Sequence, residues 1–131
     1  MKGPGTIKRT FPATPEALTE VRDFLRRQAS AAGLSEAATD DLLLAVSEAC
    51  TNAVLHSGSD EFDVEWHDGS RAVEVAVRDR GTFRGRVRVT EVEGPGGFGI
   101  PLIAALTDRV EISEGTASDP GTRVRMTKRR S

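Results

Sequence analysis

Glu48 and Asn52 form the first pair of polar residues whose types and spacing suit chemistry. They lie four residues apart in a predicted helix, so their side chains share one face, one turn from each other. A carboxylate can act as a general base, and a carboxamide oxygen suits Mg²⁺, which takes few protein ligands and keeps phosphates and waters. Two solvated polar residues on a helix flank would look the same, so the pair indicates a site only together with other segments.

Asp79 and Gly81 form a second candidate, directly after an alternating run of valines. A carboxylate at the end of a strand can accept a hydrogen bond from the amino group of adenine, and a glycine lets the backbone approach a flat base closely. Aspartate and glycine are also common turn residues. The pair therefore indicates either an adenine contact or a plain turn.

A glycine-rich run at residues 94–99 is the third candidate. Glycines allow the backbone to approach a phosphate, and the N-terminus of a following helix offers unpaired N–H groups and the positive end of the helix dipole. The run does not end in Gly-Lys-Ser/Thr, so it is not a P-loop, and it lacks the setting of a Rossmann fingerprint. A flexible loop is the alternative interpretation.

Hydrophobic periodicity predicts the elements that must position these residues. Apolar residues recur at helical spacing in two long segments, and the apolar stripe of the second segment flanks Glu48 and Asn52. Polar and apolar residues alternate on both sides of Asp68-Gly69, which predicts an antiparallel hairpin with one buried face. The expected order is a strand at 6–11, helices at 15–33 and 35–57, strands at 62–67 and 73–78, a helix at 100–106, and strands at 109–113 and 122–127.

Local signals mark the helix ends and some structural residues. Thr14 is the expected N-cap of the first helix, with Pro15 at its first position, and Gly33 is expected to end it. Ser35 is expected to open the second helix. Structural roles are expected for Cys50 as a small buried hydrophobe, for His56 as a helix-end histidine, and for Trp66 as a core residue.

The composition is typical of one domain that spans residues 1–131. A chain of this size buries about two-thirds of its unfolded surface, so it requires no disulfide or metal staple. One cysteine excludes an intramolecular disulfide, and two histidines provide no zinc-ligand cluster. We find no apolar signal core and no stretch near the roughly 20 apolar residues of a membrane span, which predicts a cytoplasmic protein without a membrane partner.

The charges are balanced and interleaved. Eighteen basic and twenty acidic residues give a formal net charge of −2. The basic run at residues 128–130 is expected to be a frayed, solvated terminus. Nothing else in the sequence resembles a stripe that could follow a phosphate backbone, so direct binding of nucleic acid is not expected.

The order of the three candidate motifs, followed by Gly121-Thr122 in the last predicted strand, resembles the ATPase family shared by gyrase-type enzymes and histidine kinases. Within that family the chain looks like the bacterial anti-sigma-factor serine kinases of stress-response and sporulation switches. The matching stretches are residues 48–56, 77–81, 97–103 and 121–126. The resemblance implies an α/β two-layer sandwich, in which a mixed, mostly antiparallel sheet carries helices on one face.

The resemblance also implies roles for individual residues. Glu48 would activate the attacking hydroxyl as the catalytic base, and Asn52 would hold Mg²⁺ beside ATP. The implied nucleotide contacts are Asp79 and Gly81 at the adenine, Thr122 at the adenine end, and Gly97 and Gly99 at the phosphates. The segment between Gly81 and Gly97 would be a lid over the nucleotide.

The function implied by the resemblance is that of an ATP-dependent protein serine/threonine kinase and anti-sigma factor. It would phosphorylate an anti-sigma-factor antagonist, sequester a sigma factor and form a homodimer. The chain departs from the family where Thr82 and Phe83 stand in place of a second glycine after Gly81. That departure favours a non-catalytic nucleotide-binding interaction module, whereas Glu48 favours the kinase because a pure binder needs only the metal ligand. A third possibility, an α/β domain without a ligand, requires three motif coincidences in the right order.

Overall fold

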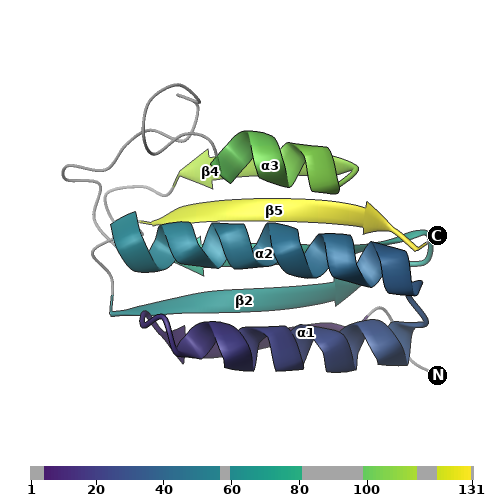
Figure 1. The fold of residues 1–131 in the computed structure, drawn as a ribbon, viewed down its shortest axis with the longest axis horizontal. Coiled ribbons are helices and arrows are strands. Elements are labelled where there is room, and N and C mark those ends of the chain that lie inside the picture. The colour runs from purple at the N-terminus through teal and green to yellow at the C-terminus, as the bar shows by residue number, and fades with distance from the viewer. Residues whose placement is uncertain (1–4, 57–59, 81–98, 115–120, 131) are drawn as a thin grey trace.

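One five-stranded sheet organises the computed structural model, which describes residues 5–56, 60–80, 99–114 and 121–130. The strand order is β1-β2-β3-β5-β4, and every pairing among the described residues is antiparallel. The elements are β1 Thr6–Pro12, α1 Ala17–Ala32, α2 Glu36–His56, β2 Glu61–Asp68, β3 Ala72–Asp79, α3 Gly99–Leu106, β4 Arg109–Glu114 and β5 Thr122–Arg129. The three helices lie side by side on one face of the sheet (Figure 1). The predicted two-layer α/β class is therefore confirmed.

Alternation along the central strands builds the core between the sheet and the helices. Val64 lies opposite Val77 in the neighbouring strand, and Val77 lies opposite Val124, so these side chains share the face that the helices cover. Trp66 is 2% exposed, which confirms its predicted place in the core. The opposite face carries the polar partners in the alternation, and none of the described helices lies over it (Figure 1).

An aromatic cluster joins β1, α1 and β2. The ring of Phe11 stacks on Phe62 at a centroid distance of 5.9 Å and meets Phe24 edge-on at 6.2 Å. The guanidinium of Arg9 lies 4.9 Å from the centroid of the Phe11 ring, where a cation interacts favourably with the aromatic face. In a chain with few aromatic residues, this cluster fixes the first strand and the first helix to the sheet.

The helix ends agree with the capping signals in two of three cases. Ser35 accepts a hydrogen bond from the Ala38 N–H at 3.1 Å, as expected for the cap of α2. Gly33 ends α1 in the left-handed conformation with a φ of 75°, as predicted. The expected N-cap at Thr14 is wrong, because α1 begins at Ala17 and the Thr14 carbonyl instead accepts the Ala17 N–H of a preceding turn.

The basic run at residues 128–130 is ordered, so the expectation of a frayed terminus is wrong. Strand β5 continues through Arg129, and the Lys128 Nζ donates to the carbonyl of Leu106, at the end of α3, and to Asp41 of α2. The Arg130 guanidinium donates to the carbonyl of Ala32, at the end of α1. The run is held because its cations satisfy carbonyls that helices leave unpaired at their C-termini.

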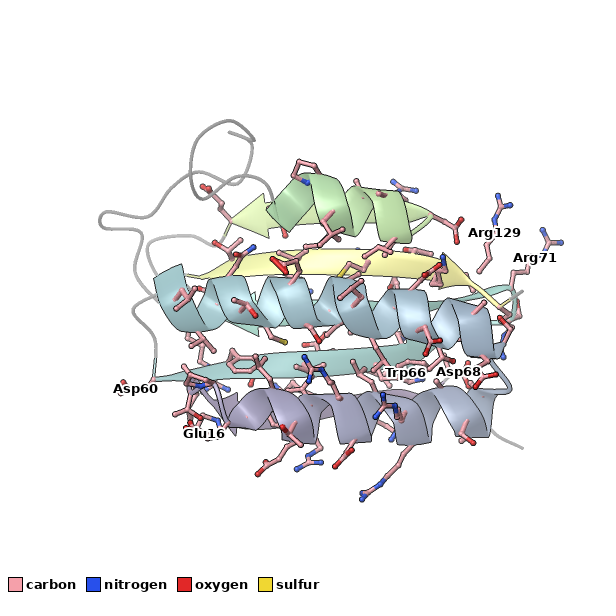
Figure 2. All side chains as sticks on the ribbon, viewed as in Figure 1. Glu16, Asp60, Trp66, Asp68, Arg71 and Arg129 are labelled. Atoms are coloured by element: carbon pink, nitrogen blue, oxygen red, sulfur yellow. The ribbon has the colours of Figure 1, made fainter. Side chains whose placement is uncertain are left out.

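The predicted hairpin between β2 and β3 is confirmed. Asp68 ends β2, and the Gly69 N–H donates to the carbonyl of Ala72 across the turn at 3.1 Å. Figure 2 shows Asp68, Arg71 and Arg129 gathered at this end of the molecule. The candidate functional residues belong to the other end.

Candidate functional site

The candidate residues lie on elements that begin or end at the end of the molecule opposite the hairpin, which we call the Asp79 end. Helix α2 and strand β3 finish there, whereas α3 and β5 start there (Figure 1). The antiparallel pairing of β3 with β5 places the end of one strand beside the beginning of the other. Helix α2 packs on both strands and on α3. The topology therefore brings the second half of α2, Asp79, Gly99 and Thr122 to one region.

Asp79 and Thr122 form a buried pair at this end. Asp79 is the last residue of β3 and is 7% exposed, and Thr122 is the first residue of β5 and is 4% exposed. The Thr122 N–H donates a hydrogen bond to Oδ1 of Asp79 at 3.2 Å. This bond fixes one carboxylate oxygen and directs the carboxylate along the face that the helices cover.

The hydroxyl of Thr122 is buried without a hydrogen-bond partner in the part of the chain that the structure describes. A buried hydroxyl without a partner costs free energy, so its presence beside an acidic acceptor needs an explanation. A purine that carries an amino group offers a donor to the carboxylate and further polar atoms to the hydroxyl. The two residues therefore fit the adenine end of ATP.

Gly121 is a site-forming residue to which the sequence motifs gave no role of its own. Its φ is 130°, and a Cβ built on it would lie 2.1 Å from the backbone oxygen of Asp79. Only glycine allows the two strand ends to approach this closely. The signal in the sequence was a glycine immediately before Thr122 at the start of a predicted strand.

Glu48 and Asn52 are carried by the second half of α2, on its boundary between core and solvent. Both side chains are partly buried, and Ala49, Cys50 and Ala53 beside them are fully buried. Neither Glu48 nor Asn52 makes a side-chain hydrogen bond or ion pair with another described residue. A carboxylate and a carboxamide with their oxygens uncommitted fit a proton acceptor and a Mg²⁺ ligand.

Of the other expected site residues, the structure describes some and leaves others outside the described residues. Gly99 is the first residue of α3, so its backbone lies at the N-terminus of an eight-residue helix, as the phosphate-binding prediction requires. Gly81 and Gly97, with the predicted lid between them, lie outside the described residues. The side chain of His56 also lies outside them, so its expected role stays a prediction.

Cys50 has the structural role predicted for it. Its side chain is fully buried in the α2 stripe, and burial raises the pKa of its thiol because desolvation disfavours the thiolate. A thiol that stays protonated is a poor nucleophile and a poor metal ligand. Cys50 therefore contributes packing and no chemistry to the Asp79 end.

The comparisons with known proteins agree with this fold. The family model of the histidine kinase-like ATPase domain matches residues 11–128. The chain therefore belongs to the histidine kinase-like ATPase domain family, which confirms the resemblance drawn from the motifs. Among the described residues, no helix is both long and apolar enough to cross a membrane.

Similar proteins within this family indicate the enzyme class of the chain. The serine-protein kinase RsbW of Listeria innocua is 40% identical over 135 residues, which cover 90% of this chain and 83% of the relative. The serine-protein kinase RsbW of Oceanobacillus iheyensis is 34% identical over 123 residues, with 82% and 78% covered. These relatives confirm the predicted enzyme class, an ATP-dependent protein serine/threonine kinase, and nothing in them favours a non-catalytic module.

A solved structure supports the same assignment. The crystal structure of the RsbU and RsbW domains of a Mycobacterium tuberculosis protein matches this chain with a TM-score of 0.73 and 25% sequence identity. The match covers 95% of this chain and 32% of the other chain, which is therefore about three times as long. The similarity concerns one domain of that larger protein.

Proposed function

We propose that this kinase phosphorylates an anti-sigma-factor antagonist and that, once the phosphorylated antagonist has been released, it sequesters a sigma factor. The observation that carries the proposal is that Glu48 and Asn52 on α2, which have no side-chain partner among the described residues, lie at the same end of the molecule as the buried Asp79–Thr122 pair. A nucleotide-binding module would need the second pair and a metal ligand, but it would have no use for a free carboxylate beside them. The same proposal treats residues 1–131 as one domain that works in the cytoplasm, with a homodimer as its assembly.

Each residue has a definite task in this proposal. Asp79 accepts a hydrogen bond from the adenine amino group, and Thr122 contacts the same end of the nucleotide through its hydroxyl, which has no partner among the described residues. Gly81 lets the backbone approach the base, and Gly97 and Gly99 bring backbone N–H groups to the phosphates. Asn52 holds Mg²⁺ through its side-chain oxygen.

ATP would supply the phosphoryl group, and Mg²⁺ held by Asn52 would neutralise part of the phosphate charge, so catalysis is mainly a matter of positioning. Glu48 accepts the proton from the acceptor hydroxyl as the new oxygen–phosphorus bond forms and the bond to the ADP oxygen breaks. Phosphorylation would release the antagonist and leave the kinase free to hold the sigma factor. Partner choice would then follow from the phosphorylation state of the antagonist.

Transfer from radiolabelled ATP to antagonist proteins encoded in the same genome is the direct experiment. One of them should gain label on a serine or threonine, and the labelled form should no longer be retained by the immobilised kinase. A sigma factor added to the same mixture should then be retained. Retention of an antagonist without any labelling, in the presence of Mg²⁺ and ATP, would contradict the proposed reaction.

A further inference from the structure

Arg80 forms a cluster of charged and polar contacts on the sheet face opposite the described helices. Its Nη2 lies 2.7 Å from Oδ1 of Asp63 and its Nε lies 3.3 Å from Oδ2, so both carboxylate oxygens are engaged. Its Nη1 lies 3.0 Å from the carboxylate of Glu61, and the Thr10 hydroxyl donates to Oδ1 of Asp63 at 2.6 Å. We call these four residues the Arg80 clamp.

The clamp contains an acidic residue that is nearly inaccessible to solvent. Asp63 is 2% exposed although it points away from the helices, because the Arg80 guanidinium and the Thr10 hydroxyl cover it. A carboxylate that has lost its water requires a charged partner with good geometry. The hydrogen bond and the charge of Asp63 in turn raise the pKa of Arg80. The ion pair between Arg80 and the buried Asp63 is therefore required by the folded structure, whereas the pair of Arg109 and Glu111 is exposed to solvent.

The clamp also fixes the end of β3, because Arg80 directly follows the last residue of that strand. Asp79 is the last residue of β3 in register with β2, where it lies opposite Phe62, and the described register with β5 ends one residue earlier at Arg78. Arg80 follows directly. Because successive residues of a strand point to opposite faces, Asp79 faces the nucleotide end of the helices while Arg80 faces the other side. The clamp thus holds the main chain immediately after Asp79.

We infer that Arg80 is a positioning residue for the recognition of adenine by Asp79, an inference that rests on the proposed role of Asp79. By tying the end of β3 to β2 and β1, the clamp restricts the position of the Asp79 carboxylate. A hydrogen bond weakens steeply when its donor and acceptor move out of line, so a strand end that frays would lose the contact. Restricting the site before binding lowers the entropic cost of ordering it on binding.

The experiment compares two nucleotides that differ at the group that Asp79 would read. ATP carries the 6-amino group of adenine, and purine riboside triphosphate lacks it. The parent protein without substitutions, as the full chain with Mg²⁺, should bind ATP more tightly than purine riboside triphosphate, as measured by calorimetry. Arg80→Ala should reduce the affinity for ATP by about 3–10-fold, the scale of one weakened hydrogen bond to a charged group. The affinity of this variant for purine riboside triphosphate should stay within about 2-fold of the parental value.

Two further variants make the comparison independent of folding. Arg125→Ala is the matched control, because Arg125 lies on the same sheet face, has a similar side-chain exposure of 40% against 44% for Arg80, and pairs with Glu111 at 3.5 Å. It should leave both affinities unchanged. Arg80→Lys keeps the charge but lacks the fork that reaches both oxygens of Asp63, so it should give an intermediate preference for ATP even where Arg80→Ala does not fold.

The outcomes separate this inference from the proposal beneath it. A parent that binds the two nucleotides equally would overturn the role of Asp79, and that result is visible before any variant is made. A parent that prefers ATP, with the preference retained in folded Arg80→Ala or Arg80→Lys, would overturn the role of Arg80 alone. An equal loss of affinity for both nucleotides in these variants would also contradict it, because the clamp would then affect the whole site.

Discussion

Glu48 and Asn52 share one face of α2 but have different tasks in the proposed reaction, so substitution can separate them. Glu48→Gln removes a proton acceptor and keeps the shape of the side chain. The rate of phosphoryl transfer should fall by roughly 10²–10⁴-fold, the usual contribution of a positioned general base. The affinity for ATP should hardly change, because Asn52 still provides the oxygen for Mg²⁺.

Asn52→Ala is the matched variant for that experiment. It removes the metal ligand and should lower both the affinity for ATP and the transfer rate. Calorimetry with ATP and the initial rate of labelling of the antagonist measure the two quantities in each variant. Transfer by Glu48→Gln at the parental rate would show that another group accepts the proton.

Thr122 allows stability and binding to be separated at one atom. Thr122→Val keeps the shape of the side chain and removes a hydroxyl that has no partner among the described residues. No internal hydrogen bond is lost, so the free energy of unfolding should stay within about 0.5 kcal/mol or rise. The affinity for ATP should fall by about 3–10-fold because the nucleotide loses a polar contact.

Urea unfolding and calorimetry measure the two effects of Thr122→Val. Thr107→Val is the control, because the Thr107 hydroxyl donates to the carbonyl of Ile103 at 2.8 Å and its loss should reduce stability without affecting nucleotide. If Thr122→Val binds ATP as tightly as the parent, the hydroxyl has no part in the nucleotide contact.

Individual residues show what sequence reasoning can predict about the site. The spacing of Glu48 and Asn52 within one helix predicted their common face, because helical geometry is local. The hydrogen bond between Thr122 and Asp79 joins residues 43 positions apart, so only the resemblance to a family indicated that both concern adenine. The clamp of Arg80 was not predicted, since Asp63 and Thr10 have no sequence feature that sets them apart from other surface residues of strands.

At the scale of elements, the close approach of β3 and β5 depends on the absence of a side chain at Gly121. Gly121→Ala should push the strand ends apart, because its Cβ would lie 2.1 Å from the Asp79 oxygen. We expect a loss of about 3 kcal/mol or more in the free energy of unfolding, together with weaker binding of ATP.

Gly33→Ala separates the clash at Gly121 from simple backbone strain. Gly33 also has a positive φ, of 75°, but a Cβ built there meets nothing within 4 Å. The substitution should therefore cost only the strain of the left-handed conformation, about 1–2 kcal/mol, with no change in ATP affinity. Equal losses in the two variants, measured by urea unfolding, would mean that the strand ends can separate without cost.

The elements themselves were predicted where periodicity is strong and mispredicted where tertiary contacts decide. Alternating valines predicted β2 and β3, because a sheet with one covered face requires that pattern. Thr14 has the residue type of a cap, but the turn from Pro12 brings the chain into α1 only at Ala17. The run at residues 128–130 has the composition of a loose terminus, yet its hydrogen-bond partners are carbonyls on distant helices.

At the scale of the whole molecule, the fold separates a functional end from an end that serves stability. The Asp79 end carries the nucleotide residues, and the hairpin end carries the contacts of Arg130. Arg130 donates to the carbonyl of Gly69 at 3.0 Å, to the carboxylate of Asp68 and to the last carbonyl of α1. One side chain therefore connects the last strand, the β2–β3 turn and the first helix.

This separation predicts that stability can be reduced without loss of nucleotide binding. Arg130→Ala removes three hydrogen bonds, so the free energy of unfolding should fall by at least about 1.5–3 kcal/mol, the range for one hydrogen bond made by a charged group. Arg129→Ala is the matched control, because the Arg129 side chain is exposed and points away from the molecule (Figure 2). The described hydrogen bond of Arg129 to Asp108 uses the backbone N–H, which alanine retains, so the stability of this variant should change by less than about 0.5 kcal/mol.

Urea unfolding measures both changes, and calorimetry with ATP below the transition should give the parental affinity for both variants. A weaker affinity in folded Arg130→Ala would show that the two ends of the molecule are coupled through the sheet.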